Sequence, residues 1–369
     1  MKWLKKITLS SFFILSGLYL SPVMACDNGS HNSDKMMMQN HNTHHMTSYG
    51  NVPVGLMANM HHEGFMFSIK QGYMDMRGNI LDGSRISNEE ILALPNKTGS
   101  QPKNLSVVPT DMKMQMTMIS LMYAPMERIN FMAMATYTSK DMKLNSYKPM
   151  MDRGLLGTFS TSTNDLSNYS LSGLFKLKED HRSRWHMEIC LQNSAGSNDS
   201  TDTVLTPMGT SSKMILPYGM QSGDGSKRLV LGITNVKKHK EKIVWGNQIK
   251  RKLAFSDGDW SFGDELEYNT WIQYELNKSV SLSTRMKFIY QDEISGKNVL
   301  INAPVQTANP ENYGGKELHL GLGVSFWPNQ AAKKGNRLGL EIVKPVVQNK
   351  NNLQMKTNYQ IILAYQKSL

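Results

Sequence analysis

The chain has 369 residues, a formal net charge of +11 from 41 Lys/Arg and 30 Asp/Glu, and two cysteines. Two cysteines exclude a disulfide-built scaffold, and after the first 25 residues no run of 18 apolar residues predicts a transmembrane helix. The positive charge favours anionic partners, although no basic helix or aromatic-basic module points to nucleic acid. The length suits one large domain or two ordinary ones.

The first 25 residues have the pattern of a secretory signal peptide. Three lysines within the first six residues precede an apolar run at 7–20, and Ala25 offers a small residue for cleavage. The run is too short for an anchor, so we expect residues 1–25 to be removed during export, leaving +8 of the +11 charge. Cleavage would make Cys26 the first residue, which also allows lipidation. Pro22 and Met24 fit a lipidation motif poorly, so plain cleavage is favoured.

Residues 26–62 read as a flexible tail rich in methionine and histidine, with the stretches DKMMMQNHNTHHM and GLMANMHHEG. Of the 26 methionines that follow the cleavage site, 20 precede residue 152, and six of the ten histidines precede residue 63. Thioether sulfur suits Cu(I) and imidazole suits Cu(II), so this composition is typical of a copper or silver handler. The same composition also occurs in low-complexity linkers.

From residue 63 to 369 the chain alternates apolar and polar residues, which is typical of β-strands with one apolar face. In SVSLSTRMKFIYQ, for example, Val280, Leu282 and Phe288 alternate with Ser281, Ser283 and other polar residues. The predicted strands, about twelve, lie near 63–77, 111–123, 127–140, 167–178, 182–193, 226–236, 240–253, 263–276, 279–292, 316–327, 335–346 and 354–369.

Two features favour a transmembrane antiparallel β-barrel over a soluble β-sandwich. The segments are nearer the length that a tilted strand needs to cross a bilayer than the usual five or six residues. The links also alternate between short and mostly long, and the long ones are expected at 78–110, 141–166, 194–225 and 293–315. Short periplasmic turns, long outer loops and an even strand number are the signature of a bacterial outer-membrane barrel. The end, ILAYQKSL, resembles an assembly signal but finishes in Leu369 where an aromatic residue is usual.

The stretch DMKMQMTMISLMYAP, residues 111–125, places methionine at alternate positions. We expect Ile119, Leu121 and Tyr123 to face lipid, so that the even-numbered methionines face the lumen with those of the two neighbouring strands. The candidate soft-metal ligands are Met57, Met60, His61, His62, Met74, Met76, Met112, Met114, Met116, Met132 and Met134. The alternative is that methionine is only an adaptable apolar filler, or that a one-residue register shift turns the stripe toward lipid.

Three stretches, VPVGLMANMHHEGFMFSIKQGYMDMRGN, MKMQMTMISLMYAP and LPYGMQSGDGS, resemble Gram-negative outer-membrane proteins described as transporters. These proteins are similar to the MetA-pathway phenol-degradation family and distantly to long-chain fatty-acid channels. The resemblance covers the chain from residue 52 to its end. It implies a monomeric barrel that exports or admits a small solute, often alongside heavy-metal resistance systems, and it carries over no binding residues.

The sequence therefore predicts a porin-like channel in the outer membrane for a small solute or metal ion, with Cu(I) or Ag(I) as a transported or bound ion rather than a resident cofactor. The expected partners are outer-membrane lipid, lipopolysaccharide and the barrel-assembly machinery. The alternative is a periplasm-facing copper-binding protein that uses the barrel as a scaffold. A lipid hydrolase is disfavoured, because no GxSxG elbow occurs and His186 and His319 are expected in the lumen. We therefore predict no enzyme activity.

Overall fold

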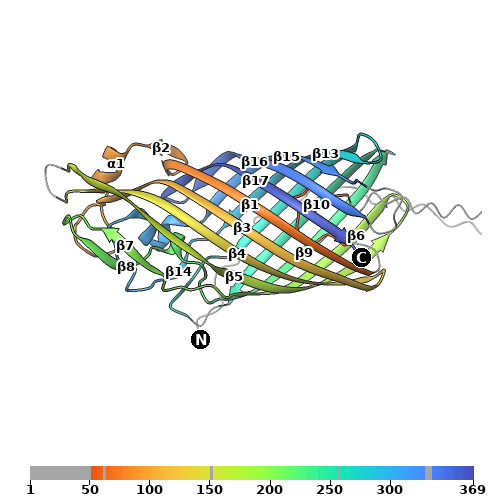
Figure 1. Ribbon diagram of the computed structural model, residues 1–369, viewed down its shortest axis with the longest axis horizontal. Helices are drawn as coiled ribbons and strands as arrows, with labels where there is room; N and C mark the ends of the chain where they lie inside the picture. Colours follow the sequence, from red (N-terminus) through yellow and green to blue (C-terminus); the bar gives the residue numbers. More distant parts are fainter. Residues whose placement is uncertain (1–50, 61–63, 150–152, 241, 256–257, 329–334) are drawn as a thin grey trace, which may run out of the picture. The chain divides into compact units, whose positions relative to one another are not determined.

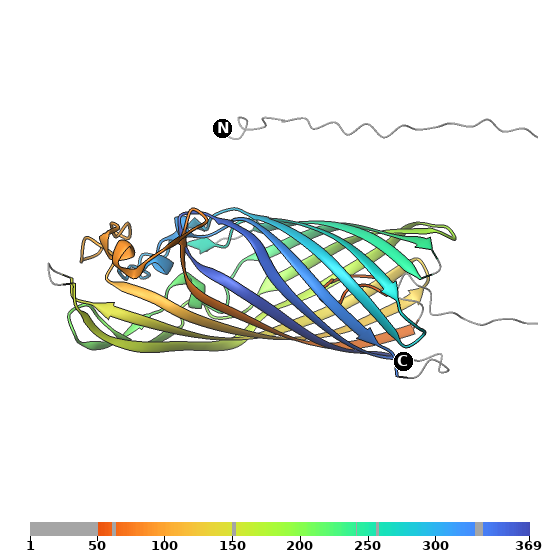
Figure 2. The same ribbon diagram turned by 90° about the horizontal axis from the view of Figure 1, so that it is seen from above.

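The computed structural model describes residues 51–60, 64–149, 153–240, 242–255, 258–328 and 335–369. Within them twelve long antiparallel strands form one sheet, which closes into a barrel because β17 pairs with β1 (Figures 1 and 2). The strands are β1 Gly64–Leu81, β3 Val107–Met126, β4 Ile129–Tyr147, β5 Leu155–Glu179, β6 Ser183–Ser194, β9 Lys227–Lys240, β10 Ile243–Phe255, β12 Glu265–Glu275, β13 Val280–Gln291, β15 Gly315–Phe326, β16 Asn336–Lys350 and β17 Leu353–Ser368. The predicted all-β barrel and its strand number are confirmed. The signal peptide and the tail up to residue 50 lie outside the described residues.

The alternation in the sequence sets which side of the barrel wall each side chain occupies. On β3, Ile119, Leu121 and Tyr123 point outward and are 47%, 46% and 42% exposed. Met112 and Met122, on the opposite face of the same strand, are 5% and 3% exposed. Period-two alternation therefore separates an outer apolar face from an inner face, as the strand geometry requires.

The outer face also excludes the soluble sandwich. Tyr268, Phe288 and Leu322 would form the centre of a sandwich, yet they lie on the outside of the barrel and are 38%, 36% and 67% exposed. A water-soluble monomer rarely presents so much contiguous apolar surface. The barrel therefore has the surface of a protein that is surrounded by hydrocarbon.

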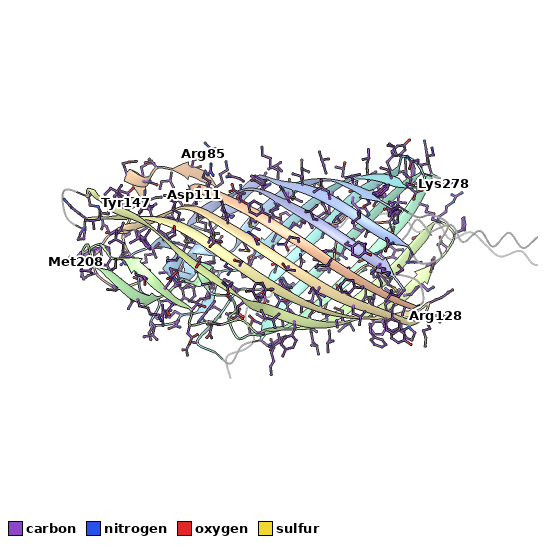
Figure 3. The ribbon with its side chains drawn as sticks, viewed as in Figure 1. Arg85, Asp111, Arg128, Tyr147, Met208 and Lys278 are labelled. Carbon is purple, nitrogen blue, oxygen red and sulfur yellow. The ribbon has the colours of Figure 1, made fainter. Side chains whose placement is uncertain are left out.

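The two ends of the barrel differ in their connections. At the short-turn end, β3 joins β4 through residues 127–128, and β5 joins β6 through 180–182. At the long-loop end, residues 82–106, 195–226 and 292–314 connect successive barrel strands. Figure 3 shows Arg128 and Lys278 at the short-turn end and Tyr147 and Met208 at the long-loop end.

One predicted long link is wrong. The stretch 141–166 is mostly strand, because β4 continues to Tyr147 and β5 already begins at Leu155. Its sequence is rich in serine and threonine and gives little apolar alternation, but threonine favours the extended chain.

Short elements occupy the long loops. They are β2 Ser84–Ile86, α1 Asn88–Ala93, β7 Thr201–Leu205, β8 Ser211–Ile215, η2 Tyr218–Met220, β11 Trp260–Ser261, β14 Ser295–Gly296, η3 Gln306–Ala308 and η4 Pro310–Asn312. A capping box starts α1, in which Ser87 and Glu90 exchange side chain-to-backbone hydrogen bonds. Among the described residues, no α-helix has the length and apolar character needed to cross a bilayer.

Candidate functional site

Residues 51–60, called the inner segment here, lie inside the barrel and belong to none of its strands. The ammonium group of Lys70, on β1, donates to the carbonyl oxygens of Val54 and Leu56, both at 2.9 Å. The buried apolar side chains of the segment are Val52, Val54, Leu56, Ala58 and Met60. This part of the predicted flexible tail is thus packed against the inner wall.

Side chains from across the barrel hold the inner segment. On β16, Arg337 donates to the carbonyl of Val52, and Glu341 accepts from the amide of Gly55. Gln248 on β10 donates to the carbonyl of Met57 at 3.0 Å, and His186 on β6 bonds that of Ala58 at 3.2 Å. Gln273 on β12 and Ser281 on β13 both donate to the side chain of Asn51. With Lys70, these contacts come from β1, β6, β10, β12, β13 and β16. The inner segment therefore crosses the bore and closes it from wall to wall.

Glycine permits the close approach of segment and wall at two positions. A Cβ atom on Gly339 of β16 would lie 2.4 Å from the Cγ2 atom of Val54. A Cβ atom on Gly55 of the inner segment would lie 2.4 Å from Arg285 and 2.8 Å from Glu341. A larger residue at Gly339 would push on Val54, and one at Gly55 would displace the side chains of Arg285 and Glu341.

The wall around the inner segment carries more positive than negative charge. Arg285 and Glu341 form a buried ion pair with 2.7 Å between Nε and Oε1, and the two side chains are 4% and 0% exposed. Lys70 and Arg337 add two cations that bond the segment's carbonyl oxygens. Among the described residues just named, three are cations and one is a carboxylate, which gives a local surplus of two positive charges.

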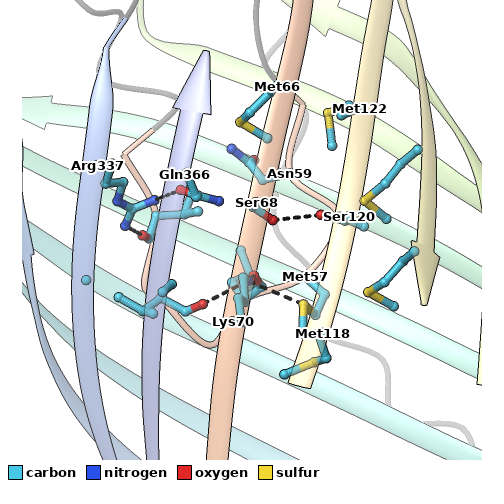
Figure 4. A pocket seen from close by; sticks show the side chains of 18 of the residues that line it. Met57, Asn59, Met66, Ser68, Lys70, Met118, Ser120, Met122, Arg337 and Gln366 are labelled. Atoms are coloured by element: carbon cyan, nitrogen blue, oxygen red, sulfur yellow. Dashed lines mark hydrogen bonds between the residues drawn. The ribbon is translucent and has the colours of Figure 1, made fainter. Parts of the chain in front are cut away.

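A cavity of about 70 Å³ lies beside the inner segment, between it and strands β1, β3, β4, β16 and β17 (Figure 4). Seven methionines line this sulfur cavity: Met57, Met60, Met66, Met118, Met122, Met132 and Met134. Its polar contacts include a 2.7 Å hydrogen bond between Ser68 and Ser120, and Lys70 donates to the sulfur of Met57 at 3.3 Å. The cavity has room for an ion or a few water molecules but is too small for an organic solute.

A second closure, called the outer closure here, fills the long-loop end with Tyr218, Met220, Trp260, Phe262 and Tyr313. The rings of Tyr218 and Trp260 meet edge to face with centroids 4.7 Å apart, and Trp260 and Phe262 do the same at 5.3 Å. The cluster packs on inward-facing side chains of the wall, among them Met112, Met142, Leu144 and Met355. Apolar and aromatic contacts therefore dominate this closure.

Polar groups fix the outer closure at a few points. Burial raises the pKa of Tyr313, so its hydroxyl stays protonated. It donates to the carbonyl of Thr307 at 2.8 Å and accepts from the amide of Gly219 at 2.7 Å. Lys140, on β4, donates to the carbonyl oxygens of Gly219, at 3.0 Å, and Gln221. The loop is thereby tied to the wall through a cation.

An apolar pocket of about 670 Å³ lies at the long-loop end beside the outer closure. Its lining includes Val107, Leu144, Phe159, Leu205, Ile215 and Met220. Its volume is in the range that small organic ligands occupy, and its walls offer mainly hydrocarbon.

The predicted metal ligands do not form one site. Met57, Met60, Met132 and Met134 meet at the sulfur cavity, whereas Met76, Met112 and Met114 pack with the outer closure. Met74 and Met116 are half-buried on β1 and β3, and His61 and His62 lie outside the described residues. Within the described ranges, no group of three or more His, Cys, Asp or Glu side chains is arranged to hold a metal ion.

Sequence reasoning missed the residues that hold the inner segment. The alternation on β1 placed Lys70 inward, but nothing in the sequence indicated that its partners would be backbone carbonyls. The segment itself has no strand periodicity. The pattern Val-Pro-Val-Gly at 52–55, with its close-packing glycine, is the signal that could have marked it.

No family model and no curated protein matches the chain. Among solved structures, an outer membrane channel from Pseudomonas putida F1 is similar, with 11% identity, a TM-score of 0.56, and 86% of this chain and 100% of that chain covered. A FadL homologue from Pseudomonas aeruginosa has 7% identity, a TM-score of 0.39 and coverages of 82% and 90%. The toluene transporter TodX of P. putida has 11% identity, a TM-score of 0.41 and coverages of 84% and 91%. The first of these likenesses establishes a shared fold.

Proposed function

We propose that this protein is an outer-membrane channel of a Gram-negative bacterium that admits or exports a small solute and rests in a closed state. The apolar outer face, the charged inner face and the fold shared with an outer membrane channel support this proposal. The short-turn end then faces the periplasm, and the pocket at the long-loop end offers an apolar group a first binding place. The surrounding lipid, including lipopolysaccharide, and the barrel-assembly machinery are its proposed partners, and we propose that it is monomeric.

The inner segment is the observation that carries the proposal. It closes the bore with hydrogen bonds to six strands, yet it contributes no strand to the barrel. Its departure would therefore leave every strand-to-strand hydrogen bond intact. A closure that can leave in this way is a gate rather than a structural core.

Single-channel conductance in planar bilayers tests the gate. We would replace residues 51–60 with a Gly/Ser chain of equal length, substitute Trp260→Ala to loosen the outer closure, and combine the two. We expect discrete conductance steps that grow at least fivefold from the wild type to the combined variant. Replacing residues 206–210, the exposed turn between β7 and β8, is the control. A combined variant that is folded and shows no steps would contradict channel function.

A second candidate function is the binding or passage of Cu(I) or Ag(I), which seven thioethers around one cavity favour. In this proposal Met57, Met60, Met132 and Met134 contact the ion at the sulfur cavity. Further thioether ligands lie toward the long-loop end, at Met74, Met76, Met112, Met114 and Met116. Imidazole ligands are supplied by His61 and His62. The ammonium group of Lys70 beside the sulfur of Met57 opposes a cation at that one position.

Titration of the refolded protein with Cu(I) tests the methionine proposal. The triple variant Met112→Leu, Met114→Leu, Met116→Leu conserves side-chain volume. A loss of Cu(I) affinity would therefore show that the sulfur atoms bind the ion. Met286→Leu, on the outer face, is the matched control because it is 40% exposed. Equal affinity in the triple variant and the wild type would end the metal proposal for these residues.

The same refolded proteins also distinguish the proposed channel from two alternative functions. A copper-binding protein on a barrel scaffold would bind Cu(I) but show no conductance steps in any variant. A lipid hydrolase would release fatty acid from vesicles, and the proposal of a non-enzymatic channel expects none.

A further inference from the structure

Two cations of the inner wall, Lys70 and Arg337, form no ion pair with a carboxylate in the described part of the chain. None of the ion pairs found among the described residues includes either side chain, although the neighbouring Arg285 and Lys250 are paired with Glu341 and Glu188. Lys70 is 7% exposed and Arg337 is 8% exposed, so both side chains are largely removed from bulk water. A buried cation without an anion is costly unless acceptors surround it.

The acceptors come from the inner segment. Lys70 bonds the carbonyl oxygens of Val54 and Leu56, and Arg337 bonds that of Val52. The remaining partners of Arg337 are neutral: the hydroxyl of Ser325, the side-chain amide of Gln366 at 3.0 Å and the ring of Trp327. Neutral backbone oxygens therefore occupy positions where charged oxygens would bind more strongly.

The outer closure repeats this arrangement. Lys140 is 8% exposed, has no ion pair among the described residues, and bonds the carbonyl oxygens of Gly219 and Gln221. Each closure thus places backbone carbonyls on a cation that the barrel wall leaves unpaired. These cations lie at two heights in the bore. Lys70 on β1 and Arg337 on β16 are in the short-turn half, and Lys140 on β4 is near the long-loop end.

We propose that Lys70 and Arg337 form a binding site for a small solute that carries an oxyanion, a carboxylate or a phosphate, and that the solute's oxygens replace the carbonyls of Val52, Val54 and Leu56. This inference rests on the proposed channel function, because a solute that takes these positions displaces the segment that closes the bore. Binding and opening are then coupled, and the coupling is reciprocal. The surplus of two positive charges favours an anion here.

Hydrogen–deuterium exchange of the refolded full chain in neutral micelles tests the site without relying on conductance. Sodium acetate and sodium phosphate are compared separately with sodium chloride at equal ionic strength. We expect at least a threefold faster exchange of the amides at 51–60 with acetate, phosphate or both, and no change at 216–222. A response to one salt identifies the carboxylate or the phosphate as the preferred group. Exchange that is the same in all three salts would overturn the proposal.

Charge variants locate the effect. Lys70→Gln and Arg337→Gln are expected to lose the response, Lys70→Arg to keep it, and Lys213→Gln, an exposed loop lysine, to leave it unchanged. Folding is checked by heat-dependent migration in gels, and if the Gln variants do not fold, the wild-type comparison still decides. A folded Lys70→Gln variant that responds like the wild type would also overturn the site.

The hydrogen–deuterium exchange experiment and the conductance experiment can fail separately. Conductance steps without an exchange response would remove the oxyanion site and leave the channel. An exchange response without steps in the combined variant would remove the channel and leave a binding site.

Discussion

The two closures of the bore are built on different physics. The inner segment is held by directional hydrogen bonds from six strands, many of them from charged or amide side chains. The outer closure is held by aromatic and aliphatic packing around Tyr218 and Trp260. Hydrogen bonds can be exchanged for those of a polar solute, whereas apolar packing is released only to another apolar surface. Under the proposed function, the inner segment is a polar gate and the outer closure is an apolar gate, and the two lie in series within one barrel.

The largest expected effect comes from the charge network of the polar gate. Glu341→Gln removes the carboxylate that Arg285 and the amide of Gly55 share, and it leaves three cations facing one another. We expect a loss of about 4 kcal/mol in the free energy of unfolding, measured from denaturant midpoints. Glu311→Gln is the control, since its pair with Lys97 is half-exposed and contributes at most about 1 kcal/mol. Equal losses would show that the inner network matters no more than a surface pair.

The apolar gate is tested by Trp260→Ala, which leaves a cavity beneath Tyr218 and Phe262. We expect a local loss of about 3 kcal/mol, seen as faster hydrogen exchange at 216–222. Exchange at 51–60 should stay unchanged, because Trp260 belongs to the outer closure and its apolar cluster includes no residue of the inner segment. Faster exchange in both places would mean that the gates open together.

Acid is expected to loosen the outer loops through Asp224. Burial alone would raise the pKa of its carboxyl group, but the charge of Arg228 and hydrogen bonds from Ser226 and Phe262 lower it below its ordinary value. A lowered pKa contributes stability above the unfolded-state pKa, and that stability is lost as the pH falls through the folded-state value.

Hydrogen exchange of the loop at 216–226 at pH 7 and pH 3 measures this contribution. We expect the wild type to lose about 1 kcal/mol of local stability at the lower pH, because the carboxyl group is then mostly protonated in the unfolded state. Asp224→Asn should already show that loss at pH 7 and little further change. A variant with the wild type's pH dependence would assign the acid effect to another group.

The smallest effect concerns the fit of the polar gate. Gly339→Ala places a methyl group 2.4 Å from the present position of the Val54 Cγ2 atom. We expect a cost of about 1 kcal/mol and faster exchange at 51–60, measured as above. The double variant Gly339→Ala, Val54→Ala should recover most of it. A double variant no better than the single one would show that the strain lies elsewhere.

The barrel was predictable because its signal is local. Alternation with period two fixes both the strand and the face of each side chain, so residues such as Ile119 and Met112 could be assigned from a few neighbours. Where the alternation fades into serine and threonine, at 155–165, the strand was predicted as loop. The prediction failed there because pairing with β4, rather than apolar burial, holds that part of β5.

The site could be predicted only in part. The inward position of Lys70 and of the methionines on β3 followed from alternation, but their partners did not. Residues 51–60 have no periodicity, and their contacts come from strands up to 286 positions away. The outer closure depends in the same way on loops that meet only when the barrel is complete. Long-range contacts of irregular segments leave no pattern in a single sequence.

The pairing of β17 with β1 has a consequence for how the molecule is made. Within the described part of the chain, every other barrel pairing joins strands that are consecutive around the sheet and along the chain, whereas this one joins Met66 to Ser368. The seam closes the longest loop of any barrel pairing and therefore has the highest cost in chain entropy. Until the final residues arrive, two unsatisfied edges remain, so even a short C-terminal truncation should yield insertion intermediates rather than a smaller cylinder.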